Sequence, residues 1–180
     1  MIILRFVCHD DGISRAIIAA TCNEPYDQRV AHAEGLMRGG TIIGAFAEGG
    51  VQERPLDYDG GKFKFEQIVA LSVDDDVAAR FEHYLRSPEV QKEKYDYFGL
   101  LDFVEHFDLH QQHKVFCSAL IQDDLRWIGY FPNPLPIWAR HVNPEMLRQQ
   151  ILCKRSAKVI TRDDPIFIAH IASTEKQPGG

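Results

Sequence analysis

The sequence predicts a single α+β domain in which a small antiparallel β-sheet packs against helices. Its 180 residues suffice for one domain with its own core, and 45% of them are hydrophobic. Short apolar runs typical of strands occur together with amphipathic stretches typical of helices. No internal repeat or low-complexity segment is visible. We therefore expect one folded domain over residues 1–172 and a polar, flexible tail over residues 173–180.

The first half of the chain is expected to supply most of the sheet. Residues 2–7 form a short apolar run that Asp10-Asp11-Gly12 ends, and the isoleucines of residues 13–21 lie on one stripe of a helix. Glycine-rich turns then separate further apolar runs, which is typical of β-hairpins. The strands expected here are residues 31–37, 41–47, 51–54 and 63–73, and residues 22–30 are expected to form a loop.

The second half is expected to be mainly helical. Acidic residues at positions 74–76 favour the positive end of a helix that runs to about Leu85, and Ser87-Pro88 is expected to end it. Asn143 is a good N-cap, and Pro144 suits the first helical position. The further helices expected are residues 98–107, 118–128 and 144–152. Residues 158–161 and 166–171 are expected to form closing strands joined by a turn at Asp163-Asp164-Pro165.

Charge and hydropathy exclude several classes of function. The formal charge is −6, and no basic run is interleaved with aromatic residues, so we expect no binding to nucleic acid. The longest apolar stretches, at residues 13–21 and 67–73, are too short for an integral membrane segment. The N-terminus lacks the features of a signal peptide. We therefore expect a protein that is cytoplasmic as synthesised and that needs another route for any release or export.

One of the four cysteines stands in a distinctive context. Cys8, Cys22, Cys117 and Cys153 form no C-x-x-C pair, so neither a zinc knuckle nor a disulfide framework is expected. Cys117 follows an apolar approach and opens an amphipathic helix, where backbone N–H groups and the helix dipole stabilise a thiolate. Cys117 is therefore a candidate nucleophile, although a small buried thiol in the core is the simpler alternative.

A thiolate that performs catalysis needs a partner that carries protons. Among the eight histidines, His32 is the best candidate, because it opens a predicted hairpin strand in an otherwise small, apolar run, and a strand holds a side chain rigidly. A structural role for His32 remains the alternative.

Both residues belong to a longer ordered set of motifs. In chain order these are Ser14-Arg15-Ala16-Ile17, Pro25-Tyr26, Ala31-His32-Ala33-Glu34-Gly35-Leu36-Met37, Thr41-Ile42-Ile43-Gly44-Ala45, Gly49-Gly50-Val51-Gln52-Glu53-Arg54-Pro55, Lys94-Tyr95-Asp96-Tyr97-Phe98-Gly99-Leu100-Leu101, Phe116-Cys117-Ser118-Ala119-Leu120 and Val142-Asn143-Pro144-Glu145-Met146-Leu147. The set resembles the circularly permuted papain-like cysteine amidases and peptidases, relatives of the NlpC-type endopeptidases and of the lecithin-retinol acyltransferase-like proteins. In that group the hairpin with the histidine precedes the helix with the cysteine.

The resemblance implies a papain-like fold, with a small antiparallel sheet or barrel against helices, and a cysteine hydrolase mechanism. Cys117 would attack an amide carbonyl to give a thioester, and His32 would act as general base and then as acid. Tyr97, or its neighbour Tyr95, would lie near the thiol. No cofactor and no metal are implied, and the expected partner is an amide substrate, either a peptide or a lipid-like molecule.

The sequence departs from that pattern at the residue that would orient the histidine. Such enzymes commonly carry a polar residue twelve positions after the histidine, and here that position is Gly44. Glu34 shares the face of His32 by strand alternation, and Glu48 follows the partner strand. We expect one of these two carboxylates, a water molecule or a backbone carbonyl to orient the ring, or else the triad to be incomplete.

Two other functions are consistent with the sequence. His106, His110 and His113 lie close to Glu105 and Asp108 and could bind zinc, although no His-Glu-x-x-His pattern is present. Alternatively, the chain is a non-catalytic interaction protein that retains the papain-like scaffold. The reactivity of Cys117 and the zinc content of the protein distinguish these possibilities.

Overall fold

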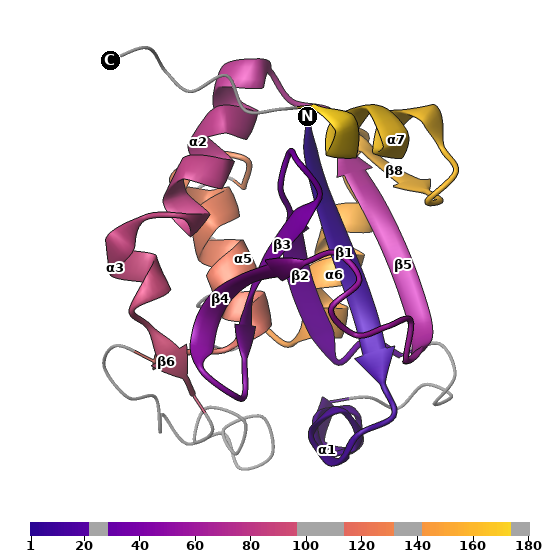
Figure 1. Cartoon of the computed structure of the whole chain (residues 1–180), viewed down its shortest axis with the longest axis vertical. Helices are drawn as coiled ribbons and strands as arrows, with labels where there is room; N and C mark the ends of the chain where they lie inside the picture. The colour runs from indigo at the N-terminus through magenta and orange to yellow at the C-terminus, as the bar shows by residue number, and fades with distance from the viewer. Residues whose placement is uncertain (22–28, 97–113, 132–141, 174–180) are drawn as a thin grey trace.

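A computed structural model describes residues 1–21, 29–96, 114–131 and 142–173 and shows an α+β fold (Figure 1). Its main sheet has six antiparallel strands in the order β4-β3-β2-β1-β5-β8. These strands are β1 (Ile2–His9), β2 (His32–Leu36), β3 (Thr41–Phe46), β4 (Gly50–Pro55), β5 (Phe63–Leu71) and β8 (Ala157–Ile160). Two further short strands, β6 (Lys94–Tyr95) and β7 (Lys114–Val115), pair in parallel.

Helices pack on both faces of this sheet. The helices of the described residues are α1 (Gly12–Thr21), α2 (Asp75–Leu85), α3 (Pro88–Gln91), α5 (Cys117–Trp127), α6 (Pro144–Leu152) and α7 (Pro165–Ala172). The larger core joins one face of the sheet to α2, α5 and α6, through residues such as Phe6, Phe81 and Leu120. A smaller core on the opposite face joins Ile3 and Ile68 to Phe167 of α7. The expected sheet packed against helices is therefore confirmed.

The hairpin that carries His32 forms as predicted. Strands β2 and β3 pair antiparallel and β2 also pairs with β1, so His32 lies opposite Val7. Gly39 and Gly40 in the turn have φ angles of 90° and 81°, which residues with a Cβ rarely adopt. Helix α5 packs against β2 and β3 (Figure 1). This packing brings the helix that begins at Cys117 to the strand that begins at His32.

Local signals placed two helices correctly. Helix α6 spans the predicted residues 144–152, and the side chain of its N-cap Asn143 accepts a hydrogen bond of 2.8 Å from the backbone N–H of Met146. Helix α2 begins at Asp75, directly after Asp74, and ends at Leu85. In both cases the capping residues, together with the acidic or proline residue at the start, predicted the boundary within a few residues.

The C-terminal prediction was wrong, because residues 166–171 form most of helix α7 and not a strand. Asp164, expected in a turn, is the N-cap of this helix, and its side chain accepts a hydrogen bond of 2.9 Å from the N–H of Ile166. Ser87-Pro88 ends α2 as expected but also opens the short helix α3. The predicted helix at residues 98–107 lies outside the described residues. No helix within the described ranges is long and apolar enough to cross a membrane.

Candidate active site

His32 and Glu34 form a close pair at the beginning of β2. Their side chains lie on the same face of the strand, and His32 Nε2 is 3.3 Å from Glu34 Oε1. The separation is that of an ion pair, but the angles are not those of a hydrogen bond. The Glu34 side chain is fully buried, whereas that of His32 is 13% exposed. Glu34 is thus the carboxylate that the structure places against the imidazole.

Gly44 lies directly beside this pair. A Cβ atom at this position would come within 3.2 Å of His32 Nε2 and 3.3 Å of Glu34 Cγ. Most Cβ contacts are longer, so a side chain at position 44 would push against both groups. The glycine therefore leaves room for the carboxylate of Glu34 at the edge of the ring. At this position the polar group beside the imidazole is thus the carboxylate of Glu34 on β2, and β3 contributes only Gly44.

Cys117 is the first residue of α5 and lies near His32. Its side chain is buried, with the residue 1% exposed, and its Sγ is 4.0 Å from the backbone oxygen of Ala31. The N-cap Phe116 supplies no side-chain hydrogen bond. The first N–H groups of a helix have no acceptor within the helix, and Cys117 stands at this end of α5.

The charges around His32 favour its protonated form. Burial alone would lower the pKa of His32, but Cys117 and Glu34 outweigh this effect and raise the pKa to about 10. Burial would in turn raise the pKa of Glu34, but His32, Arg5 and Tyr58 hold it below the usual range. A protonated imidazole between a sulfur and a carboxylate is therefore the electrostatically favoured state.

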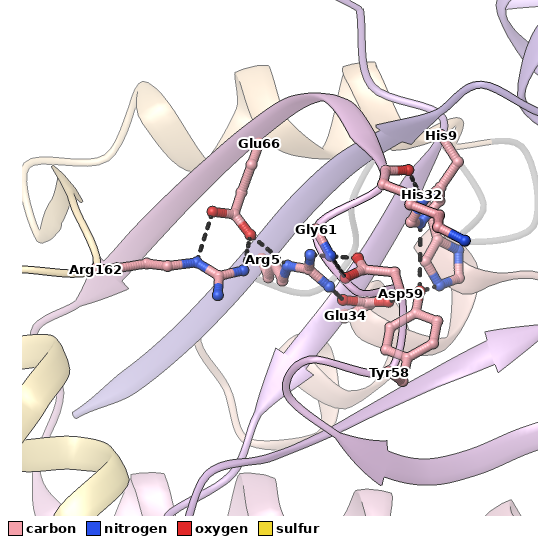
Figure 2. A network of polar contacts seen from close by, with 10 residues as sticks. Arg5, His9, His32, Glu34, Tyr58, Asp59, Gly61, Glu66 and Arg162 are labelled. Carbon is pink, nitrogen blue, oxygen red and sulfur yellow. Dashed lines mark hydrogen bonds and ion pairs between the residues drawn. The ribbon is translucent and has the colours of Figure 1, made fainter.

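A buried network of ion pairs holds Glu34 in its ionised form (Figure 2). Arg5 is 1% exposed and lies opposite Glu34 in the sheet. Its guanidinium donates to Glu34 Oε2 at 3.0 Å, to Asp59 Oδ2 at 2.6 Å and to Glu66 Oε1 at 2.7 Å. Arg162 donates two further hydrogen bonds to Glu66. Because a buried charge is costly without partners, this network fixes the position and the charge of Glu34 together.

Tyr58 connects the same carboxylate to the pocket wall. Its hydroxyl donates to Glu34 Oε1 at 2.8 Å and lies 3.3 Å from His9 Nε2 (Figure 2). Burial, together with the charge of Glu34, raises the pKa of Tyr58 above its usual range, so it stays a hydrogen-bond donor. Glu34 Oε1 therefore receives a hydrogen bond from one side and faces the imidazole on the other.

A pocket of about 870 Å³ opens above His32. Its lining includes Ala31, His32, Phe46, Arg54 and Tyr58. Cys117 itself does not line the pocket. Ala31 and His32 do, and both of these residues interact with Cys117. The sulfur is thus buried and not part of the pocket wall, and alkylation by a small electrophile tests whether a substrate carbonyl can reach it.

The remaining predicted site residues are distributed differently. Glu48 is exposed in the turn between β3 and β4 and lines the pocket, but the ion pair of His32 is formed with Glu34. Tyr95 is buried and also lines the pocket. Tyr97 lies outside the described residues, as do the histidines at positions 106, 110 and 113. Within the described ranges, no cluster of three or more His, Cys, Asp or Glu side chains could hold a metal ion.

Sequence reasoning missed the residues that support Glu34. The one signal was Arg5, a charged residue in the middle of the apolar strand β1, because a charge in such a run must be paired when it is buried. Its partners Asp59 and Glu66 lie more than fifty positions away, and no local pattern marks them.

No protein-family model matches the sequence, and a comparison with curated proteins found no match. Among solved structures, the fold is similar to the crystal structure of the metalloprotein yiiX from Escherichia coli O157:H7, described as DUF1105. The two have a TM-score of 0.50 and 13% sequence identity, over 88% of this chain and 94% of that chain. At this identity the likeness concerns the fold alone.

Proposed function

We propose that this protein is a papain-like cysteine hydrolase that cleaves an amide bond through a thioester on Cys117. The single observation that carries the proposal is His32, which interacts with both Cys117 and the buried carboxylate of Glu34 and lines a pocket. A nucleophile, a proton carrier and a group that orients it make up the minimal set for this chemistry.

In the proposed first step, the Cys117 thiolate attacks the carbonyl carbon of the amide. The C–N bond breaks, His32 gives its proton to the leaving nitrogen, and an acyl thioester remains on the sulfur. N–H groups at the beginning of α5 stabilise the negative charge on the carbonyl oxygen. In the second step, His32 takes a proton from water and the resulting hydroxide attacks the acyl carbon of the thioester. The C–S bond then breaks, the carboxylic acid leaves, and the thiolate–imidazolium pair is restored.

Glu34 has the role of a positioning residue in this scheme. Its carboxylate fixes one edge of the imidazole and stabilises the positive charge that His32 carries before the first proton transfer and regains in the second. Arg5 and Tyr58 keep that carboxylate ionised and in place. The third member of the triad is therefore supplied from the same strand as the histidine.

The reactivity of Cys117 tests the proposal. The protein is treated with iodoacetamide at pH 7, and the labelling rate of each cysteine is measured by peptide mass spectrometry. Cys153 is exposed and serves as the internal reference for an accessible thiol. Cys8 is buried and serves as the reference for a buried one. We expect Cys117 to react faster than Cys153 despite its burial, and to lose this advantage in His32→Ala, because an isolated thiol has little thiolate at this pH.

The thioester is tested in the same protein with 4-nitrophenyl acetate. We expect an acetylated Cys117 peptide after an acid quench, and none in Cys117→Ala. If Cys117 reacts no faster than Cys153 and no acetylated peptide forms, the hydrolase is contradicted and a non-catalytic interaction protein becomes the better account.

A second candidate function is metal binding, which the likeness of the fold to a metalloprotein favours. Cys117, His32 and Glu34 are side chains of the types that bind zinc, although as placed they do not form a metal site. The metal content of protein purified without a histidine tag distinguishes the two functions. Stoichiometric zinc that protects Cys117 from iodoacetamide would favour metal binding.

A further inference from the structure

Arg54 lines the pocket that contains His32, and no carboxylate of the described residues is paired with its positive charge. Its guanidinium carbon lies 3.8 Å from the centroid of the Phe46 ring and 5.2 Å from that of Tyr58. Its Nε and Nη2 donate to Gln52 Oε1 at 3.0 and 2.7 Å, and Nη2 also donates to the backbone oxygen of Glu48 at 3.2 Å. Neutral groups therefore fix the guanidinium, and within the described ranges nothing neutralises its charge.

The same aromatic ring connects Arg54 to the candidate catalytic histidine. Phe46 packs against His32 with ring centroids 5.1 Å apart, and all three residues line the pocket. Arg54 and His32 thus contact one ring, and an extended peptide, in which each residue spans roughly 3.5 Å, needs only a few residues to contact both. A single substrate molecule would therefore be bound by Arg54 at one group and react with Cys117 at another.

Among the described residues that line the pocket, three of the four acidic side chains already have a polar partner. Asp59 is paired with Arg5, and Asp11 caps the beginning of α1 by accepting from the N–H of Ser14. Asp10 is paired with both Arg15 and Lys64. Lys62 and the exposed Glu48 are the remaining charged side chains of the lining. Beside Phe46, the charge of His32 is paired with that of Glu34, so Arg54 supplies the positive charge available to a ligand there.

We propose that Arg54 is a substrate subsite for a carboxylate, and that the preferred substrates are peptide-like amides with a free carboxylate one or two residues from the scissile bond. This inference rests on the proposed hydrolase function. A guanidinium offers paired N–H donors that match a carboxylate, and stacking on Phe46 holds the donors in place before the ligand arrives. Less conformational freedom is then lost on binding.

Two matched electrophiles test the charge at the far end of a substrate. Chloroacetyl-glycylglycine carries a terminal carboxylate, and its C-terminal primary amide has the same length without the charge. Their second-order rates of alkylation of Cys117 are measured by mass spectrometry and divided by their rates with Cys153 in the same sample. We expect the acid to react about fivefold faster than the amide in the native protein, as an ion pair of modest strength would give.

Three variants locate the effect. Arg54→Gln should abolish the preference, and Arg54→Lys should retain most of it, because the charge remains. Arg80→Gln, which removes an equal charge from the exposed side of α2, should leave the preference unchanged. Thermal unfolding checks that each variant is folded. Rising salt should weaken the preference of the native protein, because salt screens the attraction.

The two proposals fail in distinguishable ways. If Cys117 is reactive but the ratio of acid to amide is the same in the native protein and in Arg54→Gln, the subsite is contradicted while the hydrolase stands. The same holds if Lys62→Gln removes the preference and Arg54→Gln does not. If Cys117 reacts with neither probe faster than Cys153, both proposals fall.

Discussion

Glu34→Gln is the substitution that tests the role of the buried carboxylate most sharply. It keeps the size of the side chain and removes one negative charge 3.3 Å from His32 Nε2. At this distance two unit charges interact by about 5 kcal/mol with an effective dielectric constant near 20. Part of this energy is lost to desolvation, and an opposite charge at such a separation shifts a pKa by about 1–3 units. We therefore expect the pKa of His32, which is about 10, to fall by that amount.

The assay is the pH dependence of the alkylation of Cys117 by iodoacetamide. In the native protein the rate should change near pH 10, where His32 loses its proton and the charge beside the sulfur changes. In Glu34→Gln this step should move about 1–3 units lower. Because each pKa unit corresponds to about 1.4 kcal/mol, we expect hydrolysis, once a substrate is known, to slow by about 10- to 1000-fold.

Glu48→Gln is the matched control, because it removes the same charge from an exposed side chain that lines the pocket and leaves the ion pair of His32 with Glu34 in place. Its alkylation profile should match that of the native protein. The stability of Glu34→Gln is measured in parallel, because Arg5 loses one of its three carboxylate partners. An unchanged profile in a folded Glu34→Gln protein would refute the positioning role of Glu34.

Three further predictions concern the site and the fold. Gly44→Ala should push a Cβ against His32 and Glu34, lowering the free energy of unfolding by about 1–3 kcal/mol in urea titrations and slowing alkylation of Cys117. The raised pKa of His32 stabilises the fold fully below about pH 6.5, so this contribution to the free energy of unfolding should disappear as the pH rises toward 10 and should be absent in His32→Gln. Asp164→Ala should remove the N-cap of α7 and lower the free energy of unfolding by about 1 kcal/mol.

Local signals in the sequence were sufficient for the hairpin and for half of the candidate site. Alternation along β2 placed His32 and Glu34 on one face, and Gly39-Gly40 marked the turn. The capping residues of α6 fixed its boundaries. Each of these signals depends on residues within a few positions of one another, so tertiary structure is not needed to read it.

The features that sequence reasoning missed depend on contacts between distant segments or on ambiguous local patterns. A run of apolar residues without clear periodicity fits either a strand or a buried helix, and Asp164-Pro165 suits either a turn or a helix start, so α7 was predicted as a strand. The network around Arg5 joins β1, β2, β5 and the loop that follows β4. Only the three-dimensional fold brings these segments together.

The titration of the His32 imidazole, followed by NMR, tests the central claim most directly. If Cys117, His32 and Glu34 act as one unit, the ring should titrate near pH 10, and Cys117→Ala should lower its pKa because one of the two groups that favour the imidazolium is lost. A pKa near the ordinary value of about 6.5 that does not change in Cys117→Ala would contradict the account.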